Sequence, residues 1–321
     1  MLKLDALSRI ACQKHLDLLR VRFDIGMTTG LASLAITDPI DKGLLNFLEN
    51  MLDGILIGSP SRLSRIARLV QGRFPAFSAY AARTQKGNAT IDLIHKNTLA
   101  VIESCFDYDK FSEKRTDWCA YELVSAHNLR ICPYCHAHHI NYYVDPDATT
   151  VARKYRIRPP LDHFLPKSTY PYLAVSLYNL VPSCPQCNSS IKSAADPLTL
   201  GLPSPHDHTS SVSIRFSAKG SIPSLFRGTV EEIKLHVTGV GIPSAALVDA
   251  FLLQERYQWY RHEIKDLIEK YEAYRNIPKE LHEIVPMERF VLGCAATEVD
   301  KRLIGRCLND IYTELKDDEL A

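Results

Sequence analysis

The chain has 321 residues, of which 46% are hydrophobic and 23% are charged, and its formal net charge at pH 7 is +1. This composition is typical of a globular protein with a substantial core, and the length predicts two or three structural units. No stretch has the uninterrupted apolar length of a membrane span. A net charge near zero gives no whole-molecule attraction for nucleic acid, so such binding has to come from a local patch.

Residues 1–130 are predicted to be mainly helical. Residues 1–19 carry a charge every few positions, as in an amphipathic helix, and lack the apolar centre of a signal peptide, so we expect a cytoplasmic protein. Apolar residues recur at helical spacing in 89–106 and again in 113–129. Asn128 suits the end of the second helix.

Residues 131–205 differ in character from the chain before them. This segment is rich in Cys, His, Pro, Asn and Tyr and shows few helical periods. Such a composition is typical of a small module that bound ligands hold together, with little apolar core of its own. We therefore predict an α+β chain in which this module is inserted between mainly helical N- and C-terminal regions.

Residues 206–321 are predicted to contain a strand pair followed by long helices. Apolar and polar residues alternate in 212–218 and 231–239, which favours two strands. Helical spacing then extends over 243–276, where Pro243 fits a first-turn position, and over 287–315. His206 and His208 lie in a Pro- and Ser-rich loop at the start of this region.

The nine cysteines are an odd number, which argues against a fully paired disulfide framework. Four of them form two Cys-x-x-Cys pairs, Cys132 with Cys135 and Cys184 with Cys187. One such pair could be a redox motif or a coincidence, but two pairs favour a closed tetrahedral zinc site of structural type. The other five are interpreted as small buried residues: Cys12, Cys105, Cys119, Cys294 and Cys307.

A family resemblance appears between and just after these pairs, in the string PPLDHFLPKSTYPYLAVSLYNLVPSCPQCNSSIKS. The string resembles the HNH nucleases, which have an Asp-His or His-His pair, then an Asn, then an Asn or His on a helix, often framed by two Cys-x-x-Cys pairs. The matching residues here are Asp162 and His163, then Asn179, then Asn188. The resemblance implies a zinc-stabilised ββα-metal module and a metal-dependent endonuclease, and it covers about residues 132–192.

The residue types suit phosphodiester hydrolysis, which needs an activated water and a means to stabilise charge on the phosphate. A neutral imidazole can take a proton from water at cellular pH, so His163 is the candidate general base. Asp162 and Asn188 offer the hard oxygen ligands that Mg²⁺ or Mn²⁺ prefers. The resemblance implies the same roles for these three residues.

The setting of this pair has to be irregular. Neighbours in a regular strand point to opposite faces, so we expect Asp162 and His163 at a strand end or a bulge. The side-chain amide of Asn179 is expected to fix the loop that carries His163, although a direct contact with the metal remains an alternative.

A local basic segment could supply phosphate contacts. Residues 153–167 carry five cations against one acid, Asp162. Lys167 and Arg158 within this segment, and Lys192 four residues after Asn188, are candidate nucleic-acid contacts, with solvated surface cations as the alternative. The histidines after the first cysteine pair lack an acidic partner at matched spacing and are interpreted as structural: His136, His138 and His139.

The wider string WCAYELVSAHNLRICPYC resembles bacterial HNH proteins of mobile elements and anti-phage systems, such as the nuclease subunit of Septu-type defence. This likeness leaves room for a partner subunit such as an ATPase. One active centre per chain would require a homodimer or sequential nicking to cut both strands.

Two other functions stay open at this stage. A zinc-ribbon module could bind nucleic acid or protein without chemistry, but it would not need Asp162, His163 and Asn188 together. An HNH enzyme could instead cleave RNA, in which case Tyr170, Tyr172 and Tyr178 would stack bases, although packing around the loop between the two strands is the preferred interpretation.

Overall fold

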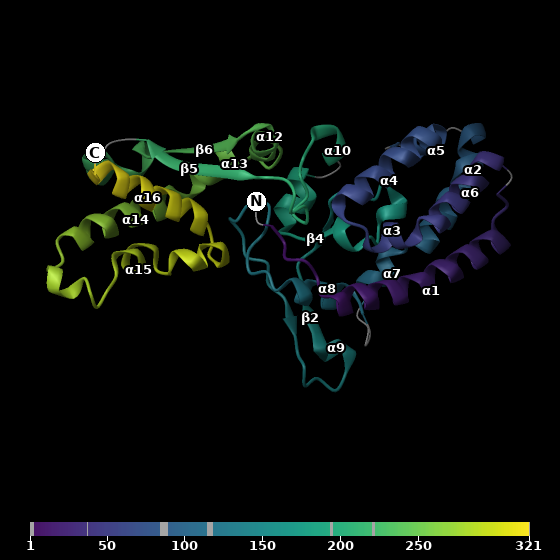
Figure 1. Cartoon of the computed structure of the whole chain (residues 1–321), viewed down its shortest axis with the longest axis horizontal. Coiled ribbons are helices and arrows are strands. Elements are labelled where there is room, and N and C mark those ends of the chain that lie inside the picture. Colours follow the sequence, from purple (N-terminus) through teal and green to yellow (C-terminus); the bar gives the residue numbers. More distant parts are fainter. Residues whose placement is uncertain are drawn as a thin grey trace.

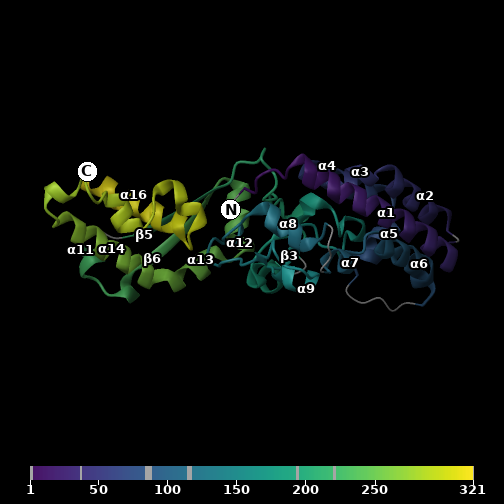
Figure 2. The ribbon, with the colours of Figure 1, turned by 90° about the horizontal axis from the view of Figure 1, so that it is seen from below.

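A computed structural model of the chain describes residues 3–36, 38–83, 89–113, 118–192, 195–219 and 222–320. Within these ranges helices predominate, and three small two-stranded antiparallel sheets accompany them. Figures 1 and 2 show the N-terminal helices (purple to blue) at one end of the molecule and the C-terminal region (green to yellow) at the other, with much of segment 131–205 (teal) between them. No helix in the described ranges is both long and apolar enough to span a membrane.

The N-terminal region consists of helices, as the sequence predicted. They are α1 (Arg9–Ser33), α2 (Pro39–Asn50), α3 (Leu52–Ile57), α4 (Pro60–Arg73), α5 (Pro75–Ala81), α6 (Ala89–Cys105), α7 (Tyr108–Ser112) and α8 (Ala120–His127). Side chains of Ser8, Asp38 and Ser59 accept backbone N–H groups at the starts of α1, α2 and α4. Helix α1 lies against α6, and a Cβ at Gly26 would come within 2.8 Å of the Cys105 backbone, so this close approach requires glycine.

The helix predicted over 113–129 is shorter in the structure. Helix α8 begins at Ala120, and Asn128 ends it in the left-handed conformation with φ 48°, which confirms the predicted helix end. Residues 114–117 of the predicted stretch lie outside the described residues.

The central segment has only short elements, as its composition indicated. They are β1 (Tyr143–Val144), α9 (Val151–Lys154), β2 (Tyr155–Ile157), β3 (Leu161–His163), η1 (Pro171–Leu173), η2 (Leu177–Asn179), β4 (Leu180–Pro182), the π-helix η3 (Gln186–Lys192) and α10 (Pro197–Leu200). Strands β3 and β4 are antiparallel, with Asp162 opposite Val181 and His163 opposite Leu180.

This segment shares in a larger apolar core than its composition suggested. Leu165, Leu173, Val175 and Val181 are buried in a hydrophobic core that continues into the N-terminal helices. The N-terminal helices therefore supply apolar contacts that a small module lacks by itself.

The C-terminal region contains the predicted strand pair. Strand β5 (Ser213–Lys219) pairs with β6 (Lys234–Val240) in antiparallel register over their whole length. The carboxylates of Asp310 and Glu314 accept the N–H groups of Phe216 and Ala218, which satisfies this edge of β5.

The remaining elements of this region are helical. They are α11 (Ile222–Arg227), η4 (Val230–Glu232), α12 (Ile242–Ala250), α13 (Leu253–Tyr257), η5 (Gln258–Tyr260), α14 (Arg261–Arg275), η6 (Lys279–Leu281), α15 (Met287–Leu292), η7 (Ala296–Lys301) and α16 (Gly305–Leu320). The continuous helix expected over 287–315 is interrupted at Gly293 and Ile304, which have φ values of 67° and 47°. Both lie in the left-handed region, which a right-handed helix cannot contain.

Two buried histidines, His15 and His206, contact the central segment from outside it, and a third, His127, packs on His206. Nε2 of His15 in α1 lies 2.8 Å from the carbonyl oxygen of Val175, and Trp118 donates its indole N–H to Nδ1 at 3.0 Å. Nε2 of His206 lies 3.1 Å from the carbonyl oxygen of Leu180, and the ring of His127 packs against His206. Burial lowers the pKa to about 4 for His15, about 3 for His127 and about 4 for His206.

We expect stability to decrease as the pH falls below about 6.5, because the unfolded chain then binds protons that these three neutral rings do not. Their contribution is complete above the unfolded pKa of about 6.5 and is lost as the pH falls toward 4. Each histidine adds a slope of up to about 1.4 kcal/mol per pH unit in this window. Urea unfolding at pH 7.5 and 5.5, with metal content monitored, measures the slope.

His206→Gln is the matched variant, because its amide can still donate to the Leu180 carbonyl but does not titrate near neutrality. Its stability should change less with pH than that of the wild type. A wild-type stability that is flat between pH 7.5 and 5.5 would contradict the assignment of neutral buried histidines.

Candidate functional site

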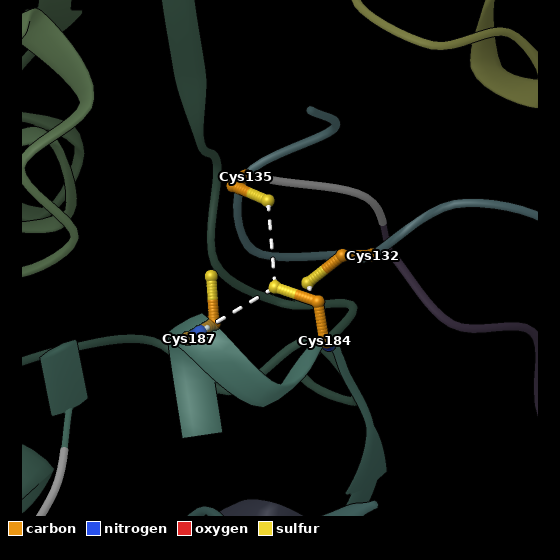
Figure 3. A group of neighbouring side chains, drawn as sticks. All are labelled: Cys132, Cys135, Cys184 and Cys187. Atoms are coloured by element: carbon orange, nitrogen blue, oxygen red, sulfur yellow. Dashed lines mark hydrogen bonds between the residues drawn. The ribbon is translucent and has the colours of Figure 1, made fainter. Parts of the chain in front are cut away.

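The four cysteines of the two Cys-x-x-Cys pairs converge in space. Cys132, Cys135, Cys184 and Cys187 are all buried, and their sulfur atoms lie within 4.8 Å of one another. Figure 3 shows the side chains pointing toward a common centre, with Cys187 on the helix η3. Within the described ranges, no other group of three or more His, Cys, Asp or Glu side chains has metal-binding geometry.

The spacing of the sulfur atoms suits a tetrahedral ion. Sγ of Cys135 and Sγ of Cys184 are 3.9 Å apart. A tetrahedral zinc with Zn–S bonds of about 2.3 Å places its sulfur ligands about 3.8 Å apart. The cluster can therefore bind a metal ion such as zinc with little rearrangement.

Nearby donors compensate the negative charge that four thiolates would carry. The backbone N–H of Cys184 donates to Sγ of Cys132, and that of Cys187 donates to Sγ of Cys184, both at 3.4 Å. The guanidinium of Arg256 donates to Sγ of Cys187 at 3.3 Å. Such bonds orient metal ligands and stabilise their charged form.

The C-terminal region holds the first cysteine loop from outside. The hydroxyl of Tyr257 donates to the carbonyl of Cys135 at 2.8 Å, and that of Tyr260 donates to the carbonyl of Ala137 at 2.7 Å. The N–H of Ile304 donates to the carbonyl of His136 at 2.8 Å. The cluster therefore connects the central and C-terminal regions.

Asp162 lies in the middle of β3 and is buried. The hydroxyl of Tyr134 donates to its Oδ2 at 2.6 Å, and Nζ of Lys192 donates to its Oδ1 at 3.0 Å. Burial raises the pKa of Asp162, while Lys192 and Tyr134 act to lower it. Both carboxylate oxygens therefore have a partner within the chain.

His163 is the last residue of β3, so the irregular setting expected of the pair is present for His163, whereas Asp162 lies within the regular β3–β4 pairing. Its Nε2 lies 2.9 Å from the carbonyl oxygen of Ala174, and the ring of Tyr108 packs edge-on against the imidazole at 4.5 Å. A carbonyl can only accept, so Nε2 carries the proton and Nδ1 has the lone pair. Burial lowers the pKa of His163 to about 3, and the cations of Lys167 and Lys192 act in the same direction.

Asn179 directly precedes β4, and its side chain is fully used. Its Oδ1 accepts the N–H of Leu165 at 2.7 Å, and its Nδ2 donates to the carbonyls of Leu165 and Leu173, each at 3.0 Å. These bonds fix the segment that follows His163. The loop-fixing contact expected of Asn179 is thus present, while its part in catalysis stays a prediction.

The helix η3 carries Asn188 and Lys192 next to the second cysteine pair. Asn188 is half-buried and directly follows Cys187. Lys192 is buried, so it is not the solvated surface lysine that was one interpretation of the sequence. In a π-helix, residues four or five positions apart lie on one face, which places Asn188 on the side of η3 from which Lys192 reaches Asp162.

The two other predicted cations lie near His163. Nζ of Lys167 is exposed and lies 5.2 Å from the centre of the Tyr108 ring. The guanidinium of Arg158 lies over the ring of Tyr121 and donates to the carbonyl of Pro159. The charge of Arg158 also acts to lower the pKa of Tyr108, the tyrosine that packs on His163, although burial raises this pKa overall.

A cavity of about 600 Å³ is lined by neighbours of His163, while His163 itself is not part of the lining. Its lining includes Tyr108 and Ala174, which both contact the imidazole, and also Lys167. Three carboxylates share this lining with the single lysine: Glu103, Asp107 and Asp109. A phosphate in this cavity would therefore need additional positive charge.

Two site residues were missed in the sequence. Tyr134 lies between the cysteines of the first pair, and its hydroxyl reaches Asp162. Tyr108 comes from α7, far from the motif along the chain. Tyr134 could have been noticed because an aromatic side chain inside a metal loop needs a partner for its hydroxyl, whereas nothing near Tyr108 in the sequence signals its role.

The tyrosines considered for base stacking have other surroundings. Tyr170 and Tyr172 are buried and pack edge-to-face on each other, and Tyr178 is half-buried beside Cys12. These tyrosines therefore pack around the loop between β3 and β4, which was the interpretation preferred from the sequence.

Comparison of the chain with protein-family models, curated proteins and solved structures gives no match. Function therefore has to be argued from the chemistry of the site.

Proposed function

We propose that the chain is an endonuclease of the HNH type that hydrolyses DNA with a divalent metal ion. The observation that carries the proposal is the order and pairing of three elements. Strand β3 ends in His163, β4 pairs with it, and the helix η3 follows with Asn188 and is fixed by Cys187. This order of two paired strands and a helix supports the ββα arrangement that the resemblance implies.

His163 has the setting of a general base. The Ala174 carbonyl holds the Nε2 proton, which leaves Nδ1 as the atom that would take a proton from water. The depressed pKa keeps the ring neutral at cellular pH, and an anionic phosphate beside it would raise that pKa toward a more effective value. Asn179 restricts the segment after His163, so the imidazole is oriented before substrate binds.

The donor atoms near η3 suit a magnesium or manganese ion in type, since Asp162 supplies a carboxylate and Asn188 an amide oxygen. The carboxylate of Asp162 already has a cation as its partner, the ammonium of Lys192 at 3.0 Å. When bound, a divalent ion would neutralise charge on the phosphate and stabilise the leaving oxygen. Lys167 and Arg158 would add phosphate contacts on the side of Tyr108.

The four-cysteine cluster would act through structure. It positions η3 through Cys187 and positions Asp162 through Tyr134, which lies within the first Cys-x-x-Cys pair. We propose zinc as its ion, because four thiolates in a closed tetrahedral site are typical of structural zinc.

A second candidate is a binding module without catalysis. The specific observation in its favour is that both oxygens of Asp162 have partners within the chain.

Because Tyr170 and Tyr172 are buried, we propose DNA as the substrate in preference to RNA.

Plasmid cleavage tests the proposal. We expect zinc-loaded protein to convert supercoiled DNA to nicked or linear DNA when Mg²⁺ or Mn²⁺ is added, and not without it. Asp162→Asn keeps the shape of the side chain but loses its charge, and should abolish this activity while zinc content is unchanged. A single-stranded RNA of matched sequence should remain intact. Cleavage by Asp162→Asn at the wild-type rate would remove Asp162 from the catalytic site. No cleavage by either protein, together with tight DNA binding, would favour the binding module.

A further inference from the structure

Lys192 occupies the position from which a cation would bind Asp162. Its Nζ donates to Oδ1 of Asp162 at 3.0 Å and to the carbonyl oxygen of His163 at 2.7 Å. The side chains of Lys192 and Asp162 are only 2% and 3% exposed. The ammonium thus has two oxygen partners that are the same kind of ligand a magnesium ion prefers.

Asp162 has a second donor besides Lys192. Tyr134 donates to Oδ2, so the two donors between them engage both oxygens of Asp162. Tyr134 is itself held in place, since its ring stacks on Phe251 at 4.5 Å with an interplanar angle of 17°. Of the two donors, Lys192 is therefore the one that can leave.

The side chain of Lys192 is suited to such a movement. Lysine places a compact charge at the end of a flexible four-carbon chain, so the ammonium can swing away without movement of the helix backbone. A divalent ion at Asp162 would also repel the ammonium, because both are positively charged and separated by only a few ångströms.

We propose that Lys192 competes with the divalent cation for Asp162, so that the metal binds only when the ammonium has left the carboxylate. This inference rests on the proposed metal-dependent function and adds a regulatory contact to the same site. In the metal-free protein Lys192 neutralises the buried carboxylate. In the metal-bound protein the released ammonium is near enough to contact a phosphate bound at the same cation.

The competition has a measurable consequence for affinity. A ligand that binds only the open form is weakened by the fraction of molecules in that form. If the open form makes up about a tenth of the molecules or less, removal of the ammonium should tighten metal binding by about tenfold or more. The variant Lys192→Gln removes the charge and keeps an N–H donor for the carbonyl of His163.

Manganese binding followed by electron paramagnetic resonance is the first measurement. We use Mn²⁺ alone as the probe, with zinc-loaded protein and without nucleic acid. Lys192→Gln should bind Mn²⁺ at least about tenfold more tightly than the wild type, and the double variant with Asp162→Asn should not bind it. Zinc content and circular dichroism establish that each variant is folded.

Labelling of lysines in the wild type is a second measurement that needs no variant at Lys192. Acetylation at pH 8 with peptide mass spectrometry should leave Lys192 unlabelled in the absence of Mn²⁺, since it is buried, and label it when Mn²⁺ is present. Lys270 in α14 is exposed and should be labelled equally in both conditions.

The outcomes separate this inference from the proposed function. Equal Mn²⁺ affinity of the wild type and Lys192→Gln, with Lys192 unlabelled throughout, would overturn the competition and leave the metal site in place. Absence of Mn²⁺ binding from folded Lys192→Gln would overturn the metal site itself. Tighter binding by Lys192→Gln together with labelling of Lys192 by metal would establish the competition.

Discussion

Replacement of Cys184 by serine is expected to release the metal ion from the cysteine cluster and destabilise the chain. Cys184 contacts both Cys-x-x-Cys pairs, because its Sγ lies next to Sγ of Cys135 and accepts the N–H of Cys187. Zinc binding to four thiolates contributes on the order of 10 kcal/mol to folding in small zinc modules. The wild type should contain one equivalent of zinc and the variant much less, with a clearly lower urea midpoint.

The loss of stability should extend beyond the cysteine cluster. Tyr257 and Ile304 bond to the backbone of the first cysteine loop, so the C-terminal region should become more accessible to protease in the variant. Cys12→Ser is the matched control, since this half-buried thiol lies outside the cluster. A Cys184→Ser protein with a full zinc equivalent and wild-type stability would show that the four cysteines do not form a metal site.

Replacement of His163 by alanine is expected to lower DNA cleavage by about a hundredfold to ten-thousandfold, the usual contribution of a general base. The fold should persist, because the hydrogen bond from the side chain to the Ala174 carbonyl contributes only about 1 kcal/mol. Initial rates of plasmid nicking at saturating Mg²⁺ measure the first effect, and urea unfolding measures the second.

His262→Ala is the control for this experiment. His262 is exposed on α14, away from the elements of the site, so this substitution should change neither the nicking rate nor the stability. Equal cleavage by wild type and His163→Ala would remove the role of base from His163 and would point to a contaminating nuclease. A His163→Ala protein that fails to fold would instead assign the residue to the core.

The site could be anticipated in part because its signals are local. The two Cys-x-x-Cys pairs place their thiols within reach of one ion by their own loop geometry, and the four sulfur atoms do converge. Asn179 could be assigned to the loop that carries His163 because its place in the HNH-like motif implied this role, and its amide does bond to Leu165. The catalytic roles of Asp162, His163 and Asn188 remain predictions.

Other features depended on contacts between distant parts of the chain. No spacing in the sequence predicts that Tyr134 reaches Asp162, that Tyr108 packs on His163, or that Lys192 is buried. Each contact is set by how η3 and α7 pack against β3, and a surface lysine and a buried one have the same sequence signature on a short helix.

The sequence by itself determined the helical N-terminal region, the β5–β6 pair, the helix end at Asn128 and the cysteine cluster, because periodicity, turn residues and ligand spacing are local properties. Only the tertiary structure decided where the predicted last helix breaks, at Gly293 and Ile304. The tertiary structure alone also decided that Lys192 neutralises the carboxylate of Asp162. A buried charge takes whichever opposite charge the packing brings within reach, and packing is a property of the whole fold.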